Sequence, residues 1–210
     1  MVTVEVDPVR VESRLAAEEI GCPGCGGVLG GWGHARARRI AGLADLVRPR
    51  RARCRACAVT HVLLPVSVLL RRAYAAEQIW SVWSARTDGL GHRRIAAVIR
   101  VPAATVRGWL RRAADRLEAI RNWFLGIAVT AGVDVVIPDG AGCPWRDVLA
   151  AVETAATAIR LRFGALGLLG AVTAGRVAVA ASGGRLLAPG WPPPRGWAAA
   201  TRIAPDAGIG

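Results

Sequence analysis

The feature that most constrains the fold of this chain is a repeated cysteine motif in its first third. Cys22-Pro-Gly-Cys25 is followed, with 28 residues in between, by Cys54-Arg-Ala-Cys57. In a reducing compartment such pairs favour metal ligation over disulfides. Four thiolates suit the tetrahedral geometry of a structural zinc site, which stays closed to substrate. The motif therefore predicts Zn²⁺ as a cofactor, with Cys22, Cys25, Cys54 and Cys57 as its ligands.

The residues around these pairs predict a small β ribbon over residues 20–66. Gly26 and Gly27 stand where the turn after a cysteine pair needs a positive φ, and residues 57–65 form a short β-rich run. The long gap has room for a loop or a short helix, for which residues 41–47 are the candidate. Strands are expected on either side of it.

Three further side chains could take part in metal or thiol chemistry. His34 and His61 are alternative ligands, but with four cysteines available each is more typical of a surface or phosphate-facing residue. Cys143 has no partner nearby in the sequence and is interpreted as a buried thiol.

The positive charge of the chain is concentrated in its middle. The 210 residues, enough for one or two small domains, carry a formal net charge of +13, and all 28 basic residues are arginine. Residues 34–121 hold nineteen arginines and five acids, whereas the segments before and after have net charges of −3 and +2. Codon usage alone would give a uniform excess, but a block is typical of a face that binds phosphates. The charge pattern therefore favours nucleic acid as the partner.

Five arginines surround the second cysteine pair, and two interpretations of them stay open. A Zn(Cys)₄ centre has a formal charge of −2, so nearby arginines lower the electrostatic cost of assembling four thiolates. Five arginines are more than one centre of charge −2 needs, however, and Arg36, Arg38 and Arg39 add further positive charge. The favoured interpretation is a ribbon that turns a basic face, including Arg51 and Arg53, toward DNA phosphates. The five are Arg48, Arg50, Arg51, Arg53 and Arg55.

The second motif is GHRRIAAVIRVPAATVRGWLRR, residues 91–112, whose pattern predicts a helix-turn-helix. Pro102 can begin the second helix, whereas Arg100 stands at the turn position usually held by glycine and must adopt a left-handed backbone at some cost. An ordinary helical hairpin is the alternative. The residues predicted to point inward are Ile95, Ala96, Ile99, Val101, Val106 and Trp109.

A third helix is expected just before this motif, within residues 73–89. Ile79, Trp80 and Trp83 form its apolar stripe, and Asp88-Gly89 ends it. The basic flanks favour a DNA-binding domain over residues 70–121 rather than a hairpin without a ligand.

If the second helix enters the major groove, its outward residues contact DNA. Arg107 is expected to bridge guanine O6 and N7, and Thr105 to lie near a phosphate or a thymine methyl. His92 and the neighbouring arginines are expected to hold the DNA backbone. The predicted contact residues of this domain are Arg93, Arg94, Ala103, Ala104, Thr105, Arg107, Arg111 and Arg112.

Together, the runs CPGCGG, WGHARARR, RARCRACAVTHVLLP, RRAYAAEQI and GHRRIAAVIRVPAATVRGWLRR resemble the zinc-ribbon and helix-turn-helix half of bacterial insertion-sequence transposases, over about residues 20–115. They are also similar to an uncharacterised actinobacterial family that keeps this half on its own. The resemblance implies binding to element-end or other DNA, with the four cysteines as zinc ligands and Arg107 on the recognition helix. Arg100 in the turn, and Ala75 where a serine cap would be expected, depart from the pattern.

The acids of the C-terminal half argue against catalysis. Transposases of that kind resemble one another in a ribonuclease-H-like domain, whose three carboxylates hold two metal ions. After residue 121 this chain has only five acids, four within twenty residues and one in a Pro/Gly-rich tail. No triad on separated strands can form, so no enzymatic activity is predicted. The five are Asp134, Asp139, Asp147, Glu153 and Asp206.

The C-terminal region is expected to be helical over residues 122–187. Residues 144–163 are amphipathic and begin with proline, and they either pack within the chain or pair with another copy, which leaves a homodimer open. Residues 163–182 are apolar apart from Arg176 and predict a buried helix rather than a membrane span, because a central arginine is costly in lipid. Residues 188–210 predict an extended or disordered tail.

The whole sequence predicts a mainly α protein with a small β zinc ribbon, preceded by an N-terminal extension over residues 1–19 that does not resemble a secretory signal. Its expected place is the cytoplasm, associated with the nucleoid, with no membrane partner. Its expected function is zinc-containing binding of double-stranded DNA, as a regulator or accessory factor of a mobile element. The alternatives are a protein–protein interaction adaptor and an inactive transposase remnant.

Overall fold

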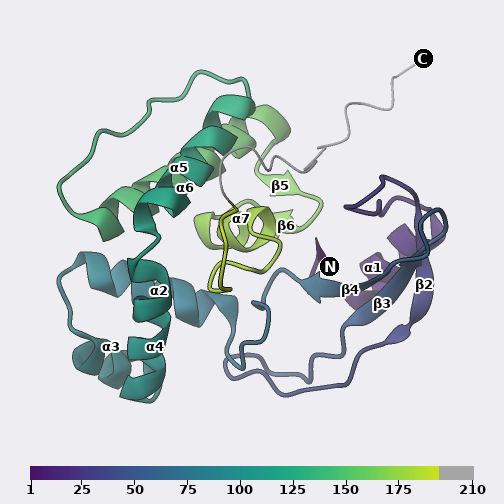
Figure 1. Ribbon diagram of the computed structural model, residues 1–210, viewed down its shortest axis with the longest axis horizontal. Coiled ribbons are helices and arrows are strands. Elements are labelled where there is room, and N and C mark those ends of the chain that lie inside the picture. Colours follow the sequence, from purple (N-terminus) through teal and green to yellow (C-terminus); the bar gives the residue numbers. More distant parts are fainter. Residues whose placement is uncertain (194–210) are drawn as a thin grey trace.

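The computed structural model describes residues 1–193, which contain both helices and strands (Figure 1). The strands within these residues are β1 (Val2–Val4), β2 (Leu29–His34), β3 (Arg50–Cys54), β4 (Thr60–Pro65), β5 (Leu166–Gly167) and β6 (Gly170–Ala171). The helices are α1 (Pro8–Ala16), α2 (Ala76–Thr87), α3 (His92–Ile99), α4 (Ala103–Ala114), α5 (Leu117–Thr130), α6 (Pro144–Phe163) and α7 (Ala174–Ala181). The chain is mainly helical with a small β part, as its sequence predicts.

A four-stranded sheet organises the first 65 residues, which we call the sheet unit. Its order is β1-β4-β3-β2, with β1 parallel to β4 and the other pairs antiparallel. Along β3, Ala52 and Cys54 are buried while Arg51 and Arg53 are exposed, because successive side chains of a strand point to opposite faces. The buried face packs against α1 in a small core made of Val4, Val11, Leu15, Ile20, Cys22, Leu29, Ala52, Cys54 and Leu63.

Residues 1–19, expected as an extension, contribute a strand and a helix to this unit. Val2 pairs with Leu63 across the parallel β1–β4 contact. The Asp7 carboxylate accepts a hydrogen bond from the Val9 backbone N–H at 2.9 Å, and Pro8 stands at the first helical position of α1. An aspartate cap followed by proline is a helix-start signal, so the sequence itself contained evidence for this helix.

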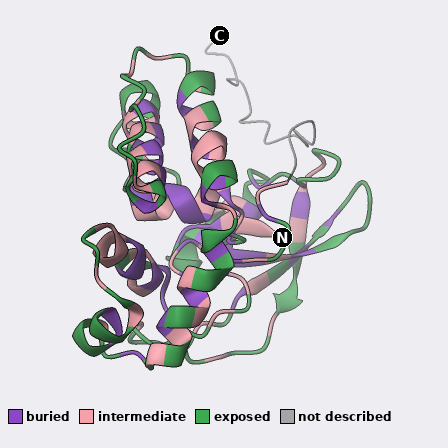
Figure 2. Ribbon diagram, turned by 60° about the vertical axis from the view of Figure 1, so that its left-hand side comes forward, coloured by how far each residue is buried: buried purple, intermediate pink, exposed green. Residues whose placement is uncertain are grey.

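The remaining helices, α2 to α7 (Figure 1), share one hydrophobic core. Ile79 and Trp83 of α2 are fully buried and Trp80 is partly buried, which confirms the predicted stripe. Trp83 packs edge-on against Trp145 of α6, with ring centroids 5.6 Å apart. The helix ends at the Asp88 cap, followed by Gly89 with a φ of +79°, as predicted. In Figure 2 the helices carry buried residues on the sides that face one another and exposed residues outside.

Helices α3 and α4 are joined by a short turn at Arg100–Pro102 and pack against each other. Arg100 has a φ of 55° and a ψ of 46°, the left-handed conformation that its position predicts. Ala75, the residue before α2, provides no side-chain cap. Of the six residues predicted to point inward, Ile99 is partly buried and the others are buried: Ile95, Ala96, Val101, Val106 and Trp109.

The C-terminal region is helical, with two corrections. Helix α6 spans the predicted residues 144–163, but the apolar stretch 163–182 is only half helical, because glycines place the short β5–β6 hairpin before α7. The predicted tail is wrong for residues 188–193: Trp191 is buried and packs edge-on against Trp123, with ring centroids 5.9 Å apart. Arg116 also donates hydrogen bonds to backbone carbonyls in this segment. The rest of the predicted tail, 194–210, lies outside the described residues.

Two smaller expectations are also settled. Residues 41–47 form a loop and no helix, because the Ala41 backbone pairs with distant residues, donating to the Ala73 carbonyl and accepting from the Ala75 N–H, both at 2.8 Å. Gly42, with a φ of +88°, packs beside Gln78.

Among residues 1–193, no helix has the length and apolar character that crossing a membrane requires.

Candidate metal centre and basic surface

The four predicted cysteines converge at one end of the sheet unit. Their sulfurs all lie within 4.8 Å of one another, and this group could hold a metal ion. Cys25 and Cys54 are 3.4 Å apart, and Cys22 and Cys57 are 3.8 Å apart, sulfur to sulfur. A disulfide would need about 2.05 Å, whereas four sulfurs about 2.3 Å from a central ion are about 3.8 Å apart. These two sulfur–sulfur distances are near the separation expected of metal-bound thiolates and well beyond that of a disulfide bond.

Two turns of the same design position the sulfurs. In the first, the Gly26 N–H donates to the Cys22 carbonyl at 2.8 Å; in the second, the Ala58 N–H donates to the Cys54 carbonyl at 3.1 Å. The residue that closes each turn has a left-handed backbone, with φ of 76° at Gly26 and 59° at Ala58. The first turn confirms the expected role of Gly26. The second achieves the same shape with alanine.

Gly27 is needed for a different reason from the one predicted. Its φ lies outside the left-handed region, but its Cα faces the second turn closely. A Cβ there would lie 2.8 Å from the Ala56 Cβ and 3.2 Å from the Cys54 sulfur. Glycine, which has no Cβ, is therefore needed at position 27 for the two cysteine turns to pack against each other.

Hydrogen bonds within the cluster shift the pKa values of the thiols in opposite directions. The Cys57 backbone N–H, 3.5 Å from the Cys54 sulfur, is the main cause that lowers the pKa of Cys54 to about 6. A backbone hydrogen bond from Val59 lowers the pKa of Cys57, but hydrogen bonds with Cys25 and Cys54 outweigh it and raise that pKa to about 12. A metal ion binds thiolates, so its binding at this cluster would release the protons that the thiols carry.

His61 lies behind the cluster and is buried, so the prediction of a surface or phosphate-facing residue is wrong for it. It is buried on β4, with Nε2 3.3 Å from the Cys22 sulfur and Nδ1 2.9 Å from the Met1 amino nitrogen. Burial, and secondarily the positive charge of that amino group, lowers the pKa of His61. A neutral ring that accepts at Nδ1 donates from Nε2 to the sulfur, as outer partners of metal ligands do. His34 is exposed and is not part of the cysteine cluster.

The arginines around the second cysteine pair divide into two groups. Arg50 pairs with Glu12 at 2.7 Å, and Arg55 pairs with Glu18, so acids of the N-terminal segment neutralise both. Arg51 and Arg53 are exposed on the outer face of β3 and form no ion pair within residues 1–193. Ion pairs with glutamates therefore involve two of the five arginines, whereas Arg48 and the two predicted for DNA contact have no carboxylate partner among the described residues.

A second set of free arginines lies on α3 and α4. In the described part of the chain, no arginine of these helices or of their turn pairs with a carboxylate. Arg107 and Arg111 are exposed on α4, on the side opposite the buried Val106 and Trp109. Of the other residues predicted for contact, Arg93, Arg94, Ala104 and Arg112 are exposed, and Ala103 and Thr105 are partly exposed.

A small hollow of about 280 Å³ opens at the start of α3, lined by residues 91–94. It is lined by His92, Arg93 and Arg94 of the first turn of α3, where backbone N–H groups lack intrahelical partners. A helix N-terminus flanked by two arginines is a place where an anion would be stabilised.

Cys143 differs from its expected role as a buried thiol. It is only partly buried and stands at the N-cap position of α6. Comparison with protein-family models, with curated proteins and with solved structures gives no match for this chain.

Proposed function

We propose that this chain is a zinc-containing protein that binds double-stranded DNA through α3 and α4, which would act as a helix-turn-helix, and serves as a regulator or accessory factor of a mobile element. The observation that carries the proposal is the uncompensated positive charge of these helices. Six arginines of α3, α4 and their turn are free of carboxylate partners among the described residues: Arg93, Arg94, Arg100, Arg107, Arg111 and Arg112.

The arrangement of α4 supports entry into the major groove. Val106, Trp109 and Ala113 fix one side of the helix in the core, so the opposite side is presented to a ligand. Ala104, Arg107 and Arg111 share that side at the helical spacing i, i+3, i+7. Small and guanidinium side chains together allow close approach and bidentate contact with guanine.

The cysteine cluster supports zinc as the metal. Four sulfur donors at tetrahedral spacing favour Zn²⁺ among the divalent ions that bind structural sites. Such a centre would make the sheet unit a zinc ribbon, with β2, β3 and β4 extending from the two turns. The metal would join turns 28 residues apart in the chain and hold Arg51 and Arg53 on a fixed face.

The test is binding of the zinc-loaded full chain to random-sequence and genomic duplex DNA, measured by anisotropy between about 50 and 200 mM salt. Affinity is expected to fall steeply with salt because arginines displace counterions from phosphates. Arg107→Ala is expected to weaken the preferred site about 5- to 150-fold and to reduce base preference. Arg10→Ala, at an exposed arginine on α1 and away from α4 (Figure 1), removes the same charge as a control.

Two results of this assay would contradict the proposal. The first is absence of duplex binding at low salt by a folded, zinc-loaded chain. The second is an equal loss for Arg107→Ala and Arg10→Ala, which would show that net charge alone, and no reading of bases, accounts for binding.

An adaptor for another protein is the second candidate, and one observation favours it. Four large apolar side chains are more than half exposed in a short segment at the end of α6 and across β5: Leu161, Phe163, Leu166 and Leu168. Exposed apolar groups of this size are typical of protein interaction sites. A complex formed through them would resist salt, whereas the DNA complex would not.

A further inference from the structure

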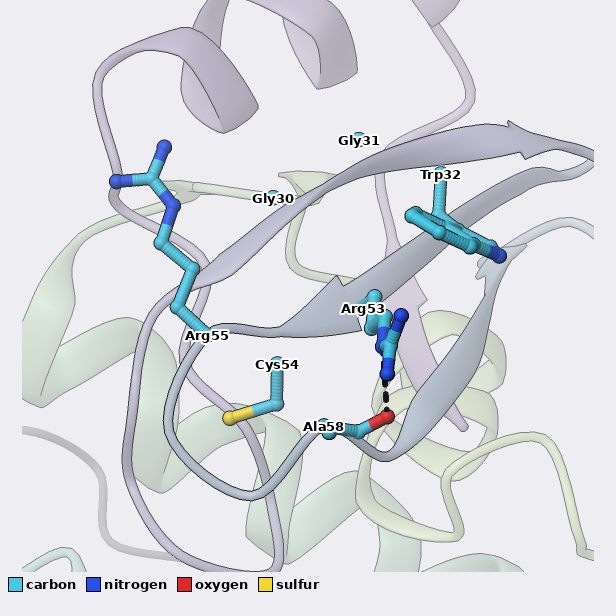
Figure 3. A pocket seen from close by; sticks show the side chains of 7 residues that line it. All are labelled: Gly30, Gly31, Trp32, Arg53, Cys54, Arg55 and Ala58. Carbon is cyan, nitrogen blue, oxygen red and sulfur yellow. Dashed lines mark hydrogen bonds between the residues drawn. The ribbon is translucent and has the colours of Figure 1, made fainter.

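The most unusual exposed side chain of the sheet unit is Trp32. It lies on the edge strand β2 and is 53% exposed, although tryptophan is usually largely buried. The Arg53 guanidinium lies over the indole, 4.9 Å from its centroid. The Arg53 Nε in turn donates to the Ala58 carbonyl at 3.1 Å, next to the second cysteine turn. The aromatic ring is thus held in place by a group anchored to the metal centre (Figure 3).

An open hollow of about 440 Å³ lies beside this ring. Gly30, two residues before Trp32, faces the same side of β2 and leaves the space between Trp32 and Arg55 empty (Figure 3). A Cβ at Gly30 would already lie 3.5 Å from the Arg55 Nε. The hollow therefore offers an aromatic ring, the unpaired guanidinium group of Arg53 and two glycines that leave its floor without side chains, while Arg55 at its edge is paired with Glu18. The residues that line it are Gly30, Gly31, Trp32, Arg53, Cys54, Arg55 and Ala58.

This combination matches the chemistry of an unpaired nucleotide. A nucleobase stacks on an indole whatever its sequence, because each base has a π-face, and guanidinium groups bind the phosphates on either side. Arg53 lacks an acidic partner within the described residues, so its charge is available to a phosphate. Paired bases inside a duplex cannot present their faces to Trp32, since neighbouring bases already cover them.

We infer that the Trp32 hollow binds single-stranded DNA, one base stacking on Trp32 while Arg53 contacts an adjoining phosphate. The inference rests on the proposed function, because it assigns a second contact to the same DNA partner. Under it, α3 and α4 bind the duplex and the sheet unit holds unpaired nucleotides next to that duplex. The favoured ligand is then DNA with a single-stranded end.

The test uses the zinc-loaded full chain with two probes, oligothymidylate of about 20 nucleotides and a blunt duplex of similar length. Trp32→Ala is expected to weaken oligothymidylate binding about 5- to 150-fold, the effect of losing one base–aromatic stack, and to leave duplex binding unchanged. Phe163→Ala is the matched control, because Phe163 is 51% exposed and Arg162 lies over its ring 5.9 Å from the centroid. Cobalt absorption of each variant checks that the cysteine centre is intact.

The outcomes separate this inference from the proposed function. Oligothymidylate binding that Trp32→Ala reduces and Phe163→Ala retains supports the hollow, whether or not the duplex binds. Duplex binding without oligothymidylate binding overturns the hollow and leaves the proposed function standing. Equal affinities of the wild type and Trp32→Ala for oligothymidylate also overturn it. Loss of both probes in Trp32→Ala with an intact cobalt spectrum overturns it as well, because the contact would then not be specific to unpaired bases.

Discussion

Gly27→Ala is the substitution that most directly tests how the two cysteine turns meet. The added methyl would lie 2.8 Å from the Ala56 Cβ, a separation below the roughly 3.0 Å that real Cβ atoms keep. It would also lie 3.2 Å from the Cys54 sulfur and 3.4 Å from the Cys25 sulfur. One side of the cluster must therefore move by several tenths of an ångström. The sulfurs can then no longer all keep their ligating positions.

The cost follows from the steric overlap. Adding a methyl group to a closely packed site costs about 1–3 kcal/mol, which corresponds to a loss of metal affinity of about 5- to 150-fold. The double variant with Ala56→Gly removes the worst contact and should recover part of the loss, because the 3.2 Å sulfur contact remains.

Zinc affinity is measured by competition with a chromophoric chelator. Gly24→Ala is the control, since its added methyl would lie 3.9 Å from the Cys22 sulfur, an ordinary contact in the same turn. Equal affinities of Gly27→Ala and Gly24→Ala would refute the reasoning. If the double variant of Gly27→Ala with Ala56→Gly recovers no zinc affinity, the contact with the Ala56 Cβ is not the cause of the loss.

Three other predictions concern positioning and stability. His61→Ala should weaken zinc affinity about 10- to 100-fold in the same competition assay, because the Cys22 sulfur loses its buried hydrogen-bond partner. Arg100→Gly should raise the free energy of unfolding in urea by about 0.5–1 kcal/mol, since glycine adopts the left-handed backbone without strain. Arg116→Ala should lower it by about 1.5–3 kcal/mol, because this guanidinium binds backbone carbonyls beyond α7.

Each of these predictions has a control of similar chemistry. His34→Ala, at an exposed histidine of β2, should leave zinc affinity unchanged, and an equal effect of both histidine variants would contradict the role of His61. Ala97→Gly, at an exposed position within α3, should lower stability by about 1 kcal/mol. A stability loss in Arg100→Gly similar to that in Ala97→Gly would show that the turn is not strained. For Arg116→Ala, an unchanged urea midpoint would show that the segment after α7 adds nothing to stability.

Local signals in the sequence were sufficient for most helices. Pro144 and the amphipathic pattern after it define α6, and Asp88-Gly89 defines the end of α2, because both depend on neighbouring residues only. The cysteine cluster was also predictable, since its ligand types and their spacing determine the chemistry. The sequence could not show which residues that are far apart in the chain come into contact in the fold.

The missed features depend on residues far apart in the chain. His61 contacts the Cys22 sulfur only because β4 lies beside the first turn, and a lone histidine carries no spacing signal. Trp32 stands among glycines, so no periodicity marks it as exposed. Trp191 packs in the core although proline and glycine surround it, because an aromatic contact outweighs the local preference for an open chain.

The parallel pairing of β1 with β4 sets an order of events during translation. Val2 leaves the ribosome about 60 residues before its partner Leu63, a delay of about 3 to 12 s at 5–20 residues per second. During the later part of that interval, from Cys25 to Cys57, the first cysteine pair is also without the second. The nascent chain therefore carries an unpaired strand and two free thiols together, and the arrival of one short segment, residues 54–65, closes both.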